Sequence, residues 1–187
     1  MAIEFLIFLT VFTPALVGGL NLFFDKNPNV RDSVTLLGAL LTFYFSANIF
    51  LEFDGQATQY SLITIMPGID IAFHIEPLGI IFSLLASGLW ILTHIYAIGY
   101  MRGAKEKNQS RFFFFFSVSI ASVMGISFSG NLFTLFLFYE LLTLITFPLV
   151  SHKGSSEALR GARVYLSILL GTSIGFQLLG IIWIYFS

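Results

Sequence analysis

Six long apolar segments constrain the fold of this chain more than any other feature of its sequence. A helix of about 20 predominantly apolar residues is long enough to cross the roughly 30 Å hydrocarbon core of a bilayer. Only 10% of the 187 residues are charged, against about a quarter in a soluble domain, and the mean hydropathy is +0.90. The sequence therefore predicts an all-α integral membrane protein, a single membrane domain over residues 1–187. Its six transmembrane helices are expected at about residues 2–24, 33–51, 77–100, 111–129, 131–150 and 161–186.

The basic residues predict how these helices are oriented. All 9 Lys and Arg residues lie in or beside the connections that follow the first, third and fifth apolar segments. Because cytoplasmic loops of membrane proteins are enriched in Lys and Arg, we expect these connections to be cytoplasmic and both termini to lie outside. A missed or extra helix would have put basic residues on both sides of the membrane. The strict alternation of basic and non-basic connections therefore supports the six-helix interpretation.

The connection between the second and third segments predicts the only β-structure. The sequences YSLITI (residues 60–65) and DIAFHI (residues 70–75) alternate or are β-branched, and they flank the turn sequence MPGI. We expect an extracytoplasmic β-hairpin at about residues 56–76, over the helix ends. Asp70, His74 and Glu76 have metal-ligand side chains, but such residues share one face of a strand by chance, and no metal site is expected.

One ionisable residue lies near the middle of a predicted span. Glu140 is halfway along residues 131–150, NLFTLFLFYELLTLITFPLV, where an acidic side chain costs at least roughly 2.5–3.5 kcal/mol. Since no Lys, Arg or His lies in the middle of another span, Glu140 is either protonated at rest or paired with a residue on another chain. We favour a proton-transfer role over a glutamate that only hydrogen-bonds between helices.

Other chemical signals are weaker. Thr143 offers a hydroxyl on the helix face of Glu140, and His94, in the inner third of the third span, is either a relay group or a satisfied interior imidazole. No hydrolase, kinase or phosphate-loop motif is present, so no catalytic residue is assigned and enzyme status stays open. The chain has no Cys; no cofactor is expected, and redox chemistry would belong to a partner. Its net charge of −1 argues against nucleic acid.

Small residues recur at helical spacing on two of the predicted spans. A smooth stripe of this kind lets another helix approach closely, which is how membrane helices associate. We therefore expect helix packing along the fourth and sixth spans, at Ser117, Ala121, Gly125 and Ser129 and at Ser167, Gly171 and Gly175.

Two long stretches of sequence resemble a known family. Residues 111–185, RFFFFFSVSIASVMGISFSGNLFTLFLFYELLTLITFPLVSHKGSSEALRGARVYLSILLGTSIGFQLLGIIWIY, and the upstream stretch FHIEPLGIIFSLLASGLWILTHIYAIGYMRG are similar to proton-antiporter-like membrane subunits. Respiratory complex I, membrane-bound hydrogenases and Mrp-type sodium/proton antiporters share this family. The form FYELLTL followed by PLVSH looks most like the D-type subunit of the Mrp antiporters.

The resemblance implies a role for Glu140. It matches the fifth-helix glutamate that takes part in the family's proton path, where it pairs with a lysine on the seventh helix. Tyr139 stands where many relatives have Trp, and it joins Thr143 and His94 as a weak candidate for the same path. The implied location is a bacterial or archaeal plasma membrane.

The resemblance also implies that the later helices of the family, and the lysine that pairs with the glutamate, are supplied from elsewhere. Family members usually have about fourteen helices in two inverted five-helix repeats, whereas six are predicted here, without the seventh-helix lysine. We expect either a split subunit completed by another membrane subunit, which supplies the later helices and the lysine, or a truncated remnant.

Three functional hypotheses follow. The leading one is the N-terminal part of a monovalent cation/proton antiporter subunit in a multisubunit membrane complex. The alternatives are an assembly or scaffold subunit that moves no ions, and a proton-pumping membrane subunit of a redox-driven complex of the NADH:quinone oxidoreductase or hydrogenase type. The sequence does not separate antiport from the redox-driven case, because the redox centres would be elsewhere in either.

Overall fold

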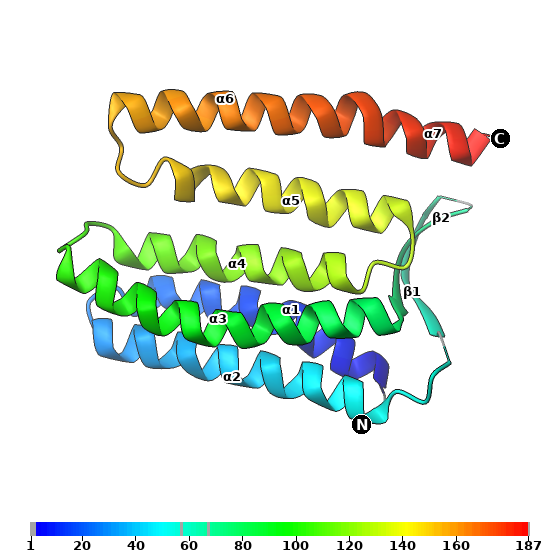
Figure 1. The fold of residues 1–187 in the computed structure, drawn as a ribbon, viewed down its shortest axis with the longest axis horizontal. Helices are drawn as coiled ribbons and strands as arrows, with labels where there is room; N and C mark the ends of the chain where they lie inside the picture. The colour runs from blue at the N-terminus through cyan, green and yellow to red at the C-terminus, as the bar shows by residue number, and fades with distance from the viewer. Residues whose placement is uncertain (1–2, 57, 67, 187) are drawn as a thin grey trace.

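The computed structural model describes residues 3–56, 58–66 and 68–186 (Figure 1). Within these residues six helical spans are long and apolar enough to cross a membrane, and a two-stranded sheet separates the second from the third. The predicted fold class is therefore confirmed. The first five spans are α1 (Ile3–Phe23), α2 (Pro28–Glu52), α3 (Pro77–Gly103), α4 (Gln109–Ser127) and α5 (Leu132–Val150); the last comprises α6 (Ser156–Thr172), a π-helical turn η1 (Ser173–Leu178) and α7 (Leu179–Phe186).

Two helices begin about five residues before their predicted starts. Proline suits the first turn of a helix, and Pro28 begins α2. The α6 helix is capped by the Ser155 side chain, which accepts a 3.1 Å hydrogen bond from the Ala158 amide. Hydropathy excludes both first turns because they carry charged residues, although helix geometry does not require apolar side chains there. The π-helical turn η1 was not predicted.

The helices run up and down in a layered bundle. The α1 helix packs between α2 and α4, α3 contacts both α2 and α4, α5 lies on α4, and α6 packs mainly on α5 at the edge of the molecule (Figure 1). The α5 and α6 helices are far less enclosed than the first four spans. The hydrophobic core cluster lies where α1, α2, α3 and α4 meet the hairpin. Its members are Leu6, Ile7, Val11, Ile49, Phe73, Ile75, Ile80, Met124 and Phe128.

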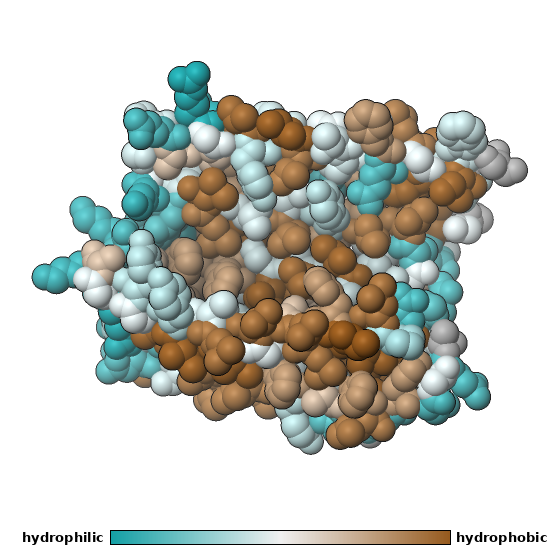
Figure 2. Space-filling view, viewed as in Figure 1, coloured by the Kyte–Doolittle hydropathy of each residue, from teal (hydrophilic) through white to brown (hydrophobic). Residues whose placement is uncertain are grey.

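The two ends of the bundle differ. The three connections with basic residues lie together at one end, and the hairpin and both ends of the described chain lie at the other (Figure 1). Hydrophilic residues gather at both ends, with apolar surface between them (Figure 2). The three basic connections lie at the same end, as the alternation of basic and non-basic connections predicts. Which end faces the cytoplasm stays a prediction.

The hairpin is bonded to the α4–α5 turn and so positions the start of α5. Strands β1 (Thr58–Met66) and β2 (Ile69–Ile75) pair antiparallel, with Tyr60 opposite Phe73. The amide of Gly130 donates to the Ala72 carbonyl at 2.7 Å, and the amide of His74 donates to the Phe128 carbonyl at 2.8 Å. A Cβ at position 130 would lie 2.9 Å from the Ala72 oxygen, so this close approach favours glycine.

Candidate functional site

The α5 helix is fixed at its first turn by side-chain hydrogen bonds. The Asn131 side chain accepts from the Thr134 amide at 2.7 Å and donates to the Asp70 carbonyl at 2.7 Å. The buried Thr134 hydroxyl accepts from the Ala72 amide at 3.0 Å. These bonds cap the helix and hold it to β2, so the axial position of every residue along α5 is defined.

Glu140 lies in the middle of α5, about nine residues from either end, with its side chain half-buried. Its Oε1 atom is buried and has no hydrogen-bond partner within the described residues. No ion pair joins it to a Lys, Arg or His in that part of the chain. An unpaired carboxyl oxygen in an apolar setting either carries a proton or needs a cation from outside the described residues.

The neighbours of Glu140 supply few polar groups. Thr143, one turn further along α5, is buried, and its carbonyl accepts from the Thr146 hydroxyl at 3.0 Å. Thr146 also lies 3.2 Å from the Tyr165 hydroxyl, which connects α5 to α6. Tyr139 is half-buried. The structure thus keeps Glu140 and Thr143 on adjacent turns of one helix, whereas the roles of Tyr139 and Thr143 in a proton path stay predictions.

His94 belongs to a different part of the molecule. Its ring is fully buried, with Nε2 3.2 Å from the Asp32 carbonyl oxygen and its edge against Phe113 at a centroid distance of 5.0 Å. Nδ1 has no partner among the described residues. No hydrogen bond or ring contact in that part of the chain joins His94 to Glu140. The structure therefore places it with α2 and α4.

The sequence did not predict a buried ionic cluster next to His94. Asp32 is 4% exposed and Arg31 is 2% exposed. The Asp32 carboxylate accepts from Arg31 Nε at 2.8 Å and, through its other oxygen, from Arg102 Nε at 3.0 Å. Arg31 also donates to Ser110 at 3.2 Å and Gln109 at 3.1 Å. We call Arg31, Asp32 and Arg102 the ionic cluster; it ties together α2, α3 and the start of α4 at the basic end.

The sequence placed Arg31 and Arg102 in connections that we expect to be cytoplasmic. A paired Arg-Asp dipeptide just before an apolar segment was a local signal, because adjacent opposite charges can enter a helix end at reduced cost. The third partner lies 70 residues away from Asp32, and no sequence pattern links the two. Only the antiparallel packing of α2 and α3 brings them together.

The two small-residue stripes have different surroundings. A Cβ on Gly125 would overlap the Phe138 ring, and Ser117 lies against Gly18, whose own Cβ would be 3.2 Å from the Ser117 Cβ. The fourth-span stripe therefore faces α5 and α1. A Cβ on Gly171 or Gly175 would meet nothing within 4 Å among the described residues.

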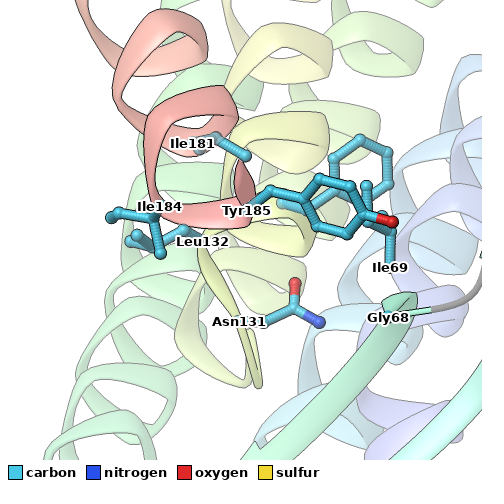
Figure 3. A pocket seen from close by; sticks show the side chains of 8 residues that line it. Gly68, Ile69, Asn131, Leu132, Ile181, Ile184 and Tyr185 are labelled. Atoms are coloured by element: carbon cyan, nitrogen blue, oxygen red, sulfur yellow. The ribbon is translucent and has the colours of Figure 1, made fainter. Parts of the chain in front are cut away.

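A cavity of about 570 Å³ lies at the hairpin end (Figure 3). It is bounded by the hairpin tip, the start of α5 and the face of α7, and the Tyr185 ring approaches Gly68. Its lining is mainly apolar, and the one amide in it, Asn131, already caps α5. No group of three His, Asp or Glu residues suited to a metal ion occurs in the described part of the chain.

Comparison with known proteins gives three results. Residues 63–113 match the family model described as the N-terminus of chain 5 of NADH-ubiquinone oxidoreductase (complex I). The Na⁺/H⁺ antiporter subunit A1 of Staphylococcus aureus, for example of strains JH9 and Newman, is 31% identical over 114 residues, covering 60% of this chain and 14% of the relative. A chain of the membrane-bound sulfane sulfur reductase, described as an archaeal respiratory membrane complex, superimposes with a TM-score of 0.70 at 17% identity, over 92% of this chain and 28% of that one.

The fold and these similarities define the class of the protein. Six helices long and apolar enough to cross a bilayer are typical of a multi-pass membrane protein. Over the residues that they cover, the sequence similarities are to antiporter-like membrane subunits, the family that the sequence indicated. The relatives named above are of the A1 type, whereas the sequence favoured the D type, so the subunit type stays a prediction. The chain spans only 14% of the length of these relatives.

Proposed function

We propose that this chain forms part of an ion-translocating, antiporter-like subunit in a multisubunit membrane complex, and that Glu140 is a proton-path group. The observation that carries the proposal is the Glu140 carboxyl in the middle of α5, with Oε1 buried and unpaired among the described residues. Retaining an acid at this depth is costly, and the cost is most readily explained by a functional requirement.

In the proposed step, Glu140 alternates between an ionised state and a protonated state. When a cation from outside the described residues approaches, the ionised carboxylate is stabilised and a proton leaves. When the cation withdraws, the carboxyl takes up a proton again, because an unpaired carboxylate in an apolar setting is unfavourable. The resemblance assigns the cation to a lysine on a later helix, in another subunit or another part of the polypeptide.

The test is ion flux in vesicles that contain the purified complex. Glu140→Gln keeps the size of the side chain and removes its titration, so proton or sodium flux should fall to the level of empty vesicles while the complex assembles normally. Glu157→Gln is the matched control, because Glu157 lies in the exposed first turn of α6, and its flux should equal that of the wild type. Unchanged flux in assembled Glu140→Gln complexes would refute the proposal.

One observation favours a second candidate, a scaffold subunit. Gly171 and Gly175 present a smooth face on α6 and η1, with no described residue against it, which suits close approach by a helix of another subunit. In that case Gly171→Leu would abolish co-purification of the other subunits, and Glu140→Gln would leave flux unchanged. Mass spectrometry of the mildly solubilised complex also separates antiport from the redox-driven alternative, since redox subunits would be present only in the latter.

A further inference from the structure

Two adjoining cavities at the basic end have opposite chemical character. The first, of about 470 Å³, is lined by Lys105, Lys107, Arg111 and Lys153 with a single acidic residue, Glu106; we call it the basic pocket. The second, of about 410 Å³, runs between α3 and α5 over α4; we call it the apolar groove. Both cavities are lined by Glu106, His152 and Lys153, so the two lie next to each other.

The basic pocket carries uncompensated positive charge. None of its four cationic side chains forms an ion pair within the described residues, in contrast to Arg31 and Arg102 at the same end. His152 adds a hydrogen-bonding ring, since burial, reinforced by nearby Arg111, lowers its pKa and favours its neutral form. The pocket therefore suits an anion that accepts several hydrogen bonds, such as a phosphate diester.

The apolar groove extends from this pocket along the membrane-spanning helices. Its walls come from the last turns of α3 (Thr93 to Met101), from Phe112 and Phe116 of α4, and from Leu149 and Val150 at the end of α5. Thr93 and Met101 are separated by about 12 Å along the helix axis. A groove of this length and direction suits a hydrocarbon chain that lies parallel to the helices.

Aromatic residues line the apolar groove next to the basic pocket. Tyr96 and Tyr100 are exposed on α3, with ring centroids 6.1 Å apart. The Phe112 ring packs edge-on against His152, with a centroid distance of 5.4 Å. Tyrosine favours the interface between hydrocarbon and headgroups, so the basic pocket lies at headgroup level and the groove within the hydrocarbon layer.

We propose that the basic pocket and the apolar groove together bind one anionic phospholipid, with its phosphate in the pocket and an acyl chain in the groove. The proposal depends on charge complementarity at headgroup level and on the shared wall of the two cavities, formed by Glu106, His152 and Lys153. A zwitterionic lipid fits the groove but gains less from the pocket, because its own cation opposes the surplus of Lys and Arg. The site is independent of Glu140.

Native mass spectrometry of the full chain in mild detergent tests the site. Phosphatidylglycerol should bind with a stoichiometry of one, and more tightly than phosphatidylcholine with the same acyl chains. The triple variant Lys107→Gln, Arg111→Gln, Lys153→Gln should weaken phosphatidylglycerol binding about tenfold or more. The control triple Lys26→Gln, Arg160→Gln, Arg163→Gln removes equal charge from the basic end outside the pocket, and its binding should be unchanged.

A second variant tests the groove without changing charge. Ala97→Phe fills the groove and should displace the lipid, whereas Leu92→Phe, at an exposed position of the same helix, should not. Equal losses in the two charge triples would show general attraction to an anionic surface and overturn the proposal. Glycerol 3-phosphate binding as tightly as phosphatidylglycerol, or an Ala97→Phe variant with unchanged lipid binding, would also overturn it.

Discussion

Asp32→Asn should destabilise this protein strongly although it replaces only one oxygen of the side chain by nitrogen. Asp32 is the only acidic partner of Arg31 among the described residues, and Arg31 is 2% exposed. With asparagine at position 32, Arg31 has only neutral acceptors in that part of the chain: the new amide oxygen, Ser110 and Gln109. Removing one partner of a buried ion pair leaves an uncompensated charge, and the expected loss is about 3–5 kcal/mol of unfolding free energy.

The matched variant is Arg102→Gln. The Arg102 side chain is 40% exposed in its pair with Asp32, so water screens much of the interaction, and Asp32 keeps Arg31 as its partner. The expected loss is about 1 kcal/mol or less. A third variant, Arg31→Met with Asp32→Leu, removes both buried charges and should be more stable than Asp32→Leu alone.

Unfolding by sodium dodecyl sulfate, followed by Trp fluorescence, measures these differences. Trp90 is 1% exposed on α3, and Trp183 is 77% exposed on α7, so a Trp183→Phe background isolates the buried reporter. A loss below about 1 kcal/mol for Asp32→Asn would refute the reasoning, because it would mean that Arg31 tolerates burial without a counter-ion. Equal losses for Asp32→Asn and Arg102→Gln would refute it as well.

Two further predictions concern packing and the hairpin. Gly125→Leu should cost about 1–3 kcal/mol of unfolding free energy in the same assay, because the new side chain would overlap Phe138. Gly171→Leu, on an open face, should leave the stability of the isolated chain unchanged. Equal effects of the two variants would contradict the packing of α4 against α5. Thr134→Val should cost about 1–3 kcal/mol because the buried Ala72 amide loses its acceptor. The control, Thr172→Val, removes only a hydroxyl bonded within its own exposed helix and should have little effect on stability. A Thr134→Val variant as stable as the wild type would show that the Thr134 bond does not hold the hairpin to α5.

The number and order of the spans were predictable because hydropathy is a local property. A segment that must satisfy its backbone inside hydrocarbon becomes a helix whatever its neighbours do. The hairpin was predictable for a related reason, since MPGI separates two β-branched runs and Gly68 adopts a φ of +87° at the turn. Helix ends were less predictable, because the first turns of α2 and α6 depend on Pro28 and on the Ser155 cap.

Glu140 was found from the sequence alone because its cost depends only on depth in an apolar span. The sequence also placed the basic connections at one end, since each successive span reverses direction. The surroundings of the charged residues were not predictable. Asp32 pairs with Arg102, His94 packs against Phe113, and Lys107 and Lys153 line one pocket only after distant helices pack. The sequence thus determined the spans, their alternation and the isolated acid, each a consequence of local polarity. The tertiary structure alone decided which charges are paired in the ionic cluster and which of the described cations stay unpaired in the basic pocket, because pairing depends on distances between helices that no local pattern encodes.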